Sequence, residues 1–193
     1  WTSIPGNLFM TMILRPDKSA ALTGQLSFVA AVALAETLEA FLPQECVVSL
    51  KWPNDVLLNG NKAAGILLEA EADGVQPVKW VLVGIGVNIA NAPEGAACLA
   101  SCGMTNIEAG QVLEKIAEKM IVIYDAWLQE GFESVRREWL RYASHDIGSA
   151  IKVRLPDRVF SGTFQGIDLT GALELDMPDG SRRQISSGEV FAA

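Results

Sequence analysis

Two lysines, a carboxylate and a glycine lie close together in the segment Lys51 to Glu69, KWPNDVLLNGNKAAGILLE. Lys51 and Lys62 are candidate anion-binding residues, because an ammonium group can hold a carboxylate or a phosphate as a point charge. Asp55 can bind Mg²⁺, which favours one or two protein carboxylates together with substrate phosphates. The alternatives are solvated surface lysines and a turn-forming aspartate. Two lysines joined by a Pro-Asn-Asp turn are a less common combination than a surface lysine or a turn aspartate alone.

Glycines inside two predicted strands indicate a narrow ligand slot. Glycine is unfavourable within a strand and is often placed where something must approach the backbone closely. Strand alternation puts Gly65 and Leu67 on one face of the first strand, and Gly84 and Gly86 on one face of the second. Such a slot suits a thin, partly apolar ligand. The alternative is that these glycines mark bulges or close packing against a helix.

The same alternation places Lys62 on the face of its strand opposite to Gly65. Asn88 ends the second strand, and its amide can recognise a donor–acceptor edge of a ligand. The surrounding GIGVN string lacks the third glycine and the following helix of a dinucleotide-binding fingerprint.

Hydrophobic periodicity predicts the elements that must position these side chains. Asn59-Gly60 is a strong signal for a hairpin turn. Helices are predicted over residues 20–41, 107–128 and 132–142, and strands over 7–14, 47–52, 62–71, 78–89, 151–155, 159–168, 172–177 and 183–186.

Composition narrows the function further. The chain has 193 residues, of which 50% are hydrophobic, and a net charge of −8, so a core can form and any anion site must be local. The absence of a basic run argues against a nucleic-acid partner for this portion. No signal peptide or apolar run of about 18 residues is evident, so we expect a cytoplasmic protein without a membrane partner.

The pattern changes near residue 147, where short strands separated by turn signals replace helices. We therefore predict an α+β fold with one domain over residues 1–146 and a small β domain over residues 147–193. His145 lies at this boundary, and no serine or cysteine partner is identifiable for a nucleophilic triad. A capping or linker role is the preferred interpretation.

These strings together resemble one family. KWPNDVLLNGNKAAGILLE is similar to the signature of biotin–protein ligases, and WTSIPGNLF and VLVGIGVNI are similar to two further segments of that family. The last strands resemble its small SH3-like C-terminal barrel. The resemblance covers nearly the whole chain. It implies a mixed or antiparallel sheet packed with helices, like a class II aminoacyl-tRNA synthetase catalytic domain, followed by the SH3-like barrel.

The resemblance also implies a two-step reaction. Biotin and MgATP give biotinyl-5′-adenylate, and the acyl group then passes to a lysine of a biotin carboxyl carrier protein. By the same resemblance Lys62 holds the biotin carboxylate and the α-phosphate, and Lys51 stabilises phosphate charge. Asp55 serves the Mg²⁺ ion or helps to deprotonate the incoming amine. A homodimer is left open.

The remaining site residues follow from the same resemblance. Gly65, Leu67 and Gly84 border the biotin ring together with Lys62. The adenylate side is assigned to Trp1, Asn7, Lys51, Asn54 and Asn88.

One departure qualifies this implication. The family also uses a Ser/Thr-containing segment, a glutamine and a Gly/Arg-rich loop, all expected before the position of Trp1. We therefore expect an N-terminally incomplete catalytic domain with weak or no activity by itself. Two alternatives are a lipoate or other acyl ligase on the same fold, and a biotin- or adenylate-binding regulator without turnover.

Overall fold

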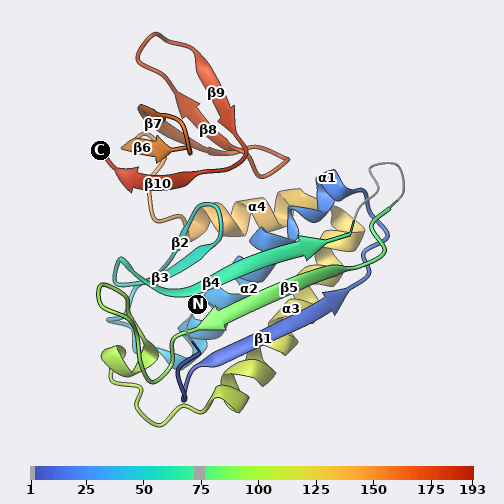
Figure 1. The fold of residues 1–193 in the computed structure, drawn as a ribbon, viewed down its shortest axis with the longest axis vertical. Helices are drawn as coiled ribbons and strands as arrows, with labels where there is room; N and C mark the ends of the chain where they lie inside the picture. The colour runs from blue at the N-terminus through green and yellow to red at the C-terminus, as the bar shows by residue number, and fades with distance from the viewer. Residues whose placement is uncertain (1–2, 72–76) are drawn as a thin grey trace.

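The computed structural model describes residues 3–71 and 77–193, so the adenylate assignment of Trp1 lies outside the described residues. The described part forms two antiparallel sheets with helices, which confirms the predicted α+β class (Figure 1). The first sheet has the order β1-β5-β4-β3-β2. Its strands are β1 (Leu8–Leu14), β2 (Val48–Lys51), β3 (Asp55–Leu58), β4 (Asn61–Ala70) and β5 (Val81–Val87).

Helices cover only one face of this sheet (Figure 1). Against that face pack α2 (Leu26–Phe41) and α3 (Ala109–Glu130). Side-chain alternation explains the arrangement, since one side of β4 and β5 carries buried residues such as Ala64, Ile66 and Val83. The other face of the sheet is open. The first sheet can therefore present residues to a ligand while its helix-covered face supplies the core.

The predicted helix over residues 20–41 is interrupted. It consists of α1 (Ala20–Thr23) and α2, separated by Gly24 and Gln25. This segment is long and apolar enough to cross a membrane by length and composition alone. However, 78% of its apolar window is buried inside the protein. A helix that is hydrophobic all round fits a core position between a sheet and other helices.

The helices α3 and α4 (Phe132–Arg141) agree with the predicted periodicity. In α3 the buried residues include Val112, Ile116 and Met120, which recur at helical spacing. The segment between the strand predicted to end at residue 89 and the helix predicted from residue 107 contains a short 3₁₀ helix, η1 (Leu99–Cys102). This turn is too short to leave a periodic pattern in the sequence.

The second sheet has the order β10-β6-β7-β8-β9 and is antiparallel throughout. Four of its strands agree with prediction, whereas the last was missed, because it is short and has only one fully buried residue, Val190. The bounds are β6 (Ala150–Arg154), β7 (Val159–Ile167), β8 (Leu173–Asp176), β9 (Arg182–Ile185) and β10 (Glu189–Ala192).

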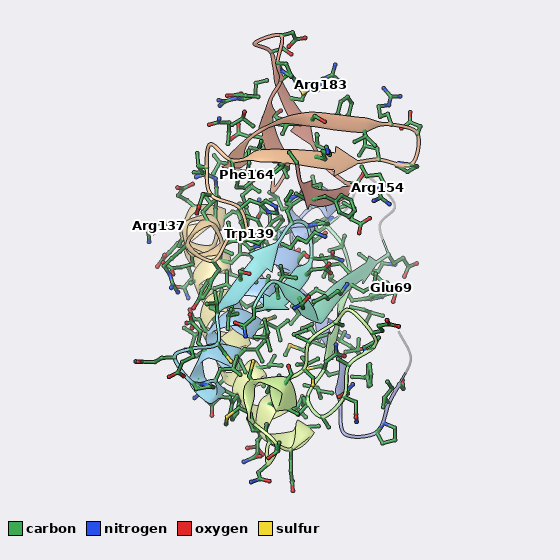
Figure 2. All side chains as sticks on the ribbon, turned by 90° about the vertical axis from the view of Figure 1, so that its left-hand side faces the viewer. Glu69, Arg137, Trp139, Arg154, Phe164 and Arg183 are labelled. Carbon is green, nitrogen blue, oxygen red and sulfur yellow. The ribbon has the colours of Figure 1, made fainter. Side chains whose placement is uncertain are left out.

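The two sheets share a continuous hydrophobic core through α4. Trp139 of α4 and Phe164 of β7 meet at this junction (Figure 2). Trp52, inside the KWPND string, donates a hydrogen bond from Nε1 to the carbonyl oxygen of Gly171 at 3.0 Å. The boundary predicted between residues 146 and 147 falls between α4 and β6. It stays a prediction.

The junction predicts a matched pair of glycine substitutions. Gly171 has φ +88°, and an added Cβ would lie 2.5 Å from Cε2 of Phe28. Gly180 has a similar φ of +82° but open space around it. We expect Gly171→Ala to lower the free energy of unfolding by about 3 kcal/mol, against about 1 kcal/mol for Gly180→Ala. Urea denaturation measures both, and equal losses would contradict close packing of the turn between β7 and β8 against α2.

Candidate functional site

A row of residues crosses the open face of the first sheet at one level. The strand pairings place in this row Lys51, Asp55, Gly65, Gly86 and Phe9, each opposite the next. Paired residues in an antiparallel sheet share a face, so these side chains project to the same side. The row therefore joins a charged end on β2 and β3 to a bare, glycine-floored middle and an aromatic end on β1.

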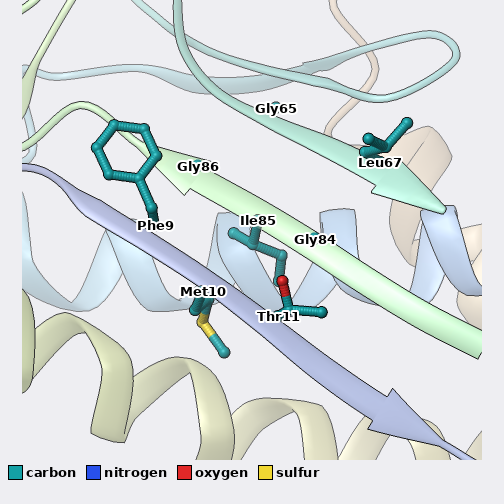
Figure 3. Close-up of a pocket in the computed structure, with 8 residues that line it drawn as sticks. All are labelled: Phe9, Met10, Thr11, Gly65, Leu67, Gly84, Ile85 and Gly86. Atoms are coloured by element: carbon teal, nitrogen blue, oxygen red, sulfur yellow. The ribbon is translucent and has the colours of Figure 1, made fainter. Parts of the chain in front are cut away.

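A cavity of about 270 Å³ lies over this bare middle (Figure 3). A second row, formed by Leu67, Gly84 and Thr11, continues its floor. Phe9 and Leu67 flank the floor, and both are exposed large apolar side chains. A glycine floor between apolar walls fits a flat, partly apolar ligand.

Sequence reasoning placed Gly65, Leu67 and Gly84 at this site and missed Phe9 and Thr11. The missing information is the pairing of β1 with β5, which joins segments about seventy residues apart in the chain. The alternation of β1 shows only that these two residues share a face. It does not identify the strand beside them.

The structure corrects the predicted orientation of Lys62. A β-bulge interrupts the pairing of β3 and β4, because Val56 pairs with Ala64 whereas Leu57 pairs with Lys62. Ala63 is the extra residue, and its carbonyl oxygen accepts a hydrogen bond from the backbone N–H of Asn88 at 2.8 Å. A bulge shifts the alternation by one residue and re-aims side chains. It turns Lys62 onto the open face.

Lys62 and Asp55 form an ion pair on that face. The distance from Lys62 Nζ to Asp55 Oδ1 is 2.5 Å, and the two side chains are 44% and 20% exposed. An ion pair with this exposure contributes little to folding. The pair places an ammonium group and a carboxylate side by side on the open face of the first sheet.

Lys51 contacts the second sheet. Its Nζ atom lies 4.8 Å from the centre of the Phe191 ring of β10. It also pairs with Asp55 across the hairpin of β2 and β3. The structure therefore brings Lys51, Asp55 and Lys62 together, as the sequence predicts.

The three candidate asparagines are all engaged in backbone contacts. Asn54 Nδ2 donates to the carbonyl oxygen of Ile66 at 2.7 Å. Asn88 is buried and donates from Nδ2 to the carbonyl oxygen of Ala97 at 3.1 Å. Asn7 Oδ1 accepts N–H groups from three consecutive residues, 89 to 91, at 2.9 to 3.2 Å. Asn7 and Asn88 thus shape the loop after β5.

The described residues contain no group of three His, Cys, Asp or Glu side chains suited to a metal ion. Asp55, the residue that the sequence predicts as a Mg²⁺ ligand, lies beside the Lys62 ammonium. One carboxylate of this kind fits an ion whose other ligands are substrate phosphates and water. It does not fit an ion held by the protein alone.

His145 lies at the junction of the sheets, with Nδ1 3.0 Å from Ser144 Oγ. Burial lowers its pKa, the positive charge of Lys51 lowers it further, and Asp146 raises it.

The lowered pKa of His145 predicts a pH dependence of stability. The unfolded chain binds a proton at this side chain more readily than the folded protein, so stability falls as the pH drops below about 6.5. We expect His145→Gln to lose less unfolding free energy between pH 7 and pH 5. Parallel pH profiles from urea denaturation would contradict this.

The described residues thus form an α+β protein with an attached β domain, whose open sheet face carries a glycine-floored cavity next to the strand that bears Asp55. The profile of the Biotin/lipoate A/B protein ligase family matches residues 3–141, and that of the Biotin protein ligase C terminal domain matches residues 146–192. The chain belongs to the biotin/lipoate protein ligase family.

Individual relatives agree with this assignment. The chain is 39% identical over 200 residues to a biotin–[acetyl-CoA-carboxylase] ligase of Paracoccus denitrificans, covering 99% of this chain and 82% of that protein. It is 32% identical to the bifunctional ligase/repressor BirA of Bacillus subtilis, of which it covers 59%. Biotin protein ligase from Aquifex aeolicus in complex with biotin and ATP matches all of the chain with a TM-score of 0.84 and 25% identity, over 82% of that structure.

Proposed function

We propose that this chain supplies the biotin and ATP site of a ligase that activates biotin with MgATP to biotinyl-5′-adenylate and transfers biotin to a lysine of a biotin carboxyl carrier protein. The observation that carries the proposal is the alignment of Lys62 and Asp55 with a glycine-floored cavity on one sheet face. The biotin–[acetyl-CoA-carboxylase] ligase relative and the solved ligase with biotin and ATP support the choice of substrate.

In the first step the cavity binds the apolar part of biotin. The ring system lies over Gly65 and Gly84 beside Leu67, and the carboxylate extends toward Lys62. The carboxylate oxygen attacks the α-phosphorus of ATP, the new acyl–phosphate bond forms, and pyrophosphate leaves. Lys62 and Lys51 offset the negative charges that this step brings together. Holding both substrates in reacting geometry contributes further to the rate.

Asp55 has two roles compatible with its position. Mg²⁺ enters with ATP as part of the substrate, and Asp55 can supply one oxygen ligand to it. After pyrophosphate has left, the carboxylate can instead accept a proton from the carrier amine. The amine nitrogen attacks the acyl carbon, the amide bond forms, and AMP leaves with the electron pair of the broken acyl–oxygen bond.

The asparagines contribute to the adenylate side through side-chain hydrogen bonds that fix the backbone there. Asn7 and Asn88 organise the loop that follows β5, and Asn54 ties the KWPND turn to β4. A direct adenylate contact of Trp1 stays a prediction from the family resemblance. A cytoplasmic location belongs to the same proposal.

Isotope-labelled biotin tests the function with the complete protein, MgATP and a purified carrier domain. The expected result is labelled adenylate without carrier and labelled carrier when it is present. Adenylate or tight biotin binding without carrier labelling would indicate a regulator. Stronger stabilisation by lipoate than by biotin in thermal unfolding would indicate a different acyl ligase. If neither labelled adenylate nor labelled carrier forms, the proposal is refuted.

A further inference from the structure

A single aromatic side chain of the second sheet connects two cationic groups beside the candidate site. The ring of Phe191 lies 4.8 Å from Lys51 Nζ and 4.4 Å from the guanidinium carbon of Arg154. Phe191 is half-buried and belongs to β10, close to the end of the chain. A cation within about 6 Å of a ring centre is attracted by the electrons of the ring face.

The strand register shows why Phe191 meets cations on this side. Phe191 pairs with Lys152, and Glu189 pairs with Arg154, so all four side chains share one face of the second sheet. Glu189 lies 3.9 Å from Arg154 Nη1. Lys51 approaches this basic face from the first sheet, where like charges would repel it. An aromatic ring face attracts an ammonium group and can offset this repulsion.

We propose that Phe191 is a positioning residue that holds the Lys51 ammonium at the phosphate end of the site. The inference rests on the proposed function, in which Lys51 stabilises phosphate charge. A lysine side chain has a flexible four-carbon stem, so an unrestrained ammonium group would sample many positions. The ring limits this sampling and keeps the charge at the β2 end of the row that contains Lys51 and Asp55. Phe191 thereby contributes to the reaction without touching the substrate.

The test compares Phe191→Leu and Phe191→Tyr in the complete protein, with biotinyl-adenylate formation as the assay. Leucine keeps apolar bulk but removes the ring, whereas tyrosine keeps the ring. We expect Phe191→Leu to lower kcat/KM for ATP about fivefold while KM for biotin stays within about twofold. Phe191→Tyr should retain wild-type kinetics. If Phe191→Leu does not fold, Phe191→Met takes its place.

Phe160→Leu is the matched control. Phe160 also lies in the second sheet and also contacts a cation, with Arg183 at 4.7 Å, but outside the cluster around Lys51. Its substitution should leave ATP kinetics unchanged. The same substitution is also made in a Lys51→Met protein. If Phe191 acts by positioning Lys51, Phe191→Leu should not lower kcat/KM for ATP any further in that background, whereas a general structural effect would lower it again.

Three outcomes would overturn the proposal. They are wild-type ATP kinetics in Phe191→Leu, an equal loss in Phe191→Tyr, and a fivefold loss that persists in the Lys51→Met background. A wild-type protein that forms no adenylate would instead refute the proposed function, and the positioning role with it.

Discussion

Lys62→Met is expected to lower the rate of biotinyl-adenylate formation by about two to three orders of magnitude. The substitution removes the ammonium group that lies 2.5 Å from Oδ1 of Asp55, which is paired with Gly65 of the cavity floor. The negative charges of biotin and ATP would then be offset by one ammonium group fewer. The unpaired Asp55 carboxylate would in addition repel both substrates. Single-turnover formation of labelled adenylate from ATP measures the effect. The unfolding free energy should change by less than about 1 kcal/mol, since the ion pair is partly exposed.

Two variants make this result specific to the position. Lys115→Met removes another ion-paired lysine, 2.9 Å from Glu118 on the exposed side of α3, and should leave adenylation unchanged. Lys62→Met combined with Asp55→Asn tests whether the loss reflects only an unpaired carboxylate. We expect the double variant to stay at least about a hundredfold slower than wild type. Recovery to within fivefold would contradict a direct role for Lys62.

Gly84→Val is expected to weaken biotin binding about a hundredfold while the protein remains folded. A Cβ added at Gly84 would make ordinary contacts, 3.5 Å from the Leu67 carbonyl oxygen and 3.7 Å from the Leu67 Cβ. The backbone can therefore accept a side chain, and valine suits a strand. The added methyl groups occupy the cavity floor, where we propose that the biotin ring lies. Isothermal titration with biotin measures the effect.

A graded series and a control on the same strand sharpen this test. Gly84→Ala should weaken biotin binding about tenfold, because it adds only one carbon atom. Leu82→Val alters the same face of β5 two residues away, beside Ile13 and Glu69 and outside the cavity. It should leave biotin binding unchanged. Equal binding by Gly84→Val and wild-type protein would place the biotin site elsewhere.

Much of the site is predictable because its main segment is local. Asn59 and Gly60 adopt φ values of +49° and +80°. Their residue types favour such values, so the hairpin of β3 and β4 follows from a few neighbouring residues. Helical periodicity likewise predicts α3 and α4 within a few residues of their ends. The spacing of two lysines and one aspartate around that turn then suffices to predict a local anion site.

Two features of the site, the face that Lys62 occupies and the position of Phe9, depend on contacts between distant segments. The bulge at Ala63 depends on how β4 pairs with β3 and on its hydrogen bond to Asn88, and it places Lys62 on the face that simple alternation excludes. Phe9 reaches the cavity only because β1 pairs with β5. No local propensity encodes which strands become neighbours.

The contact between Lys51 and Phe191 joins residues that are 140 positions apart in the chain and lie in different sheets. It depends on the core shared across α4, which sets how the second sheet packs against the first. The sequence by itself determined the α+β class and the hairpin that carries the candidate anion-binding residues, because hydrophobic periodicity and local turn residues specify them. Only the tertiary structure decided which face Lys62 occupies, what walls the cavity and what contacts Lys51, because strand pairing and sheet packing are set by the whole chain.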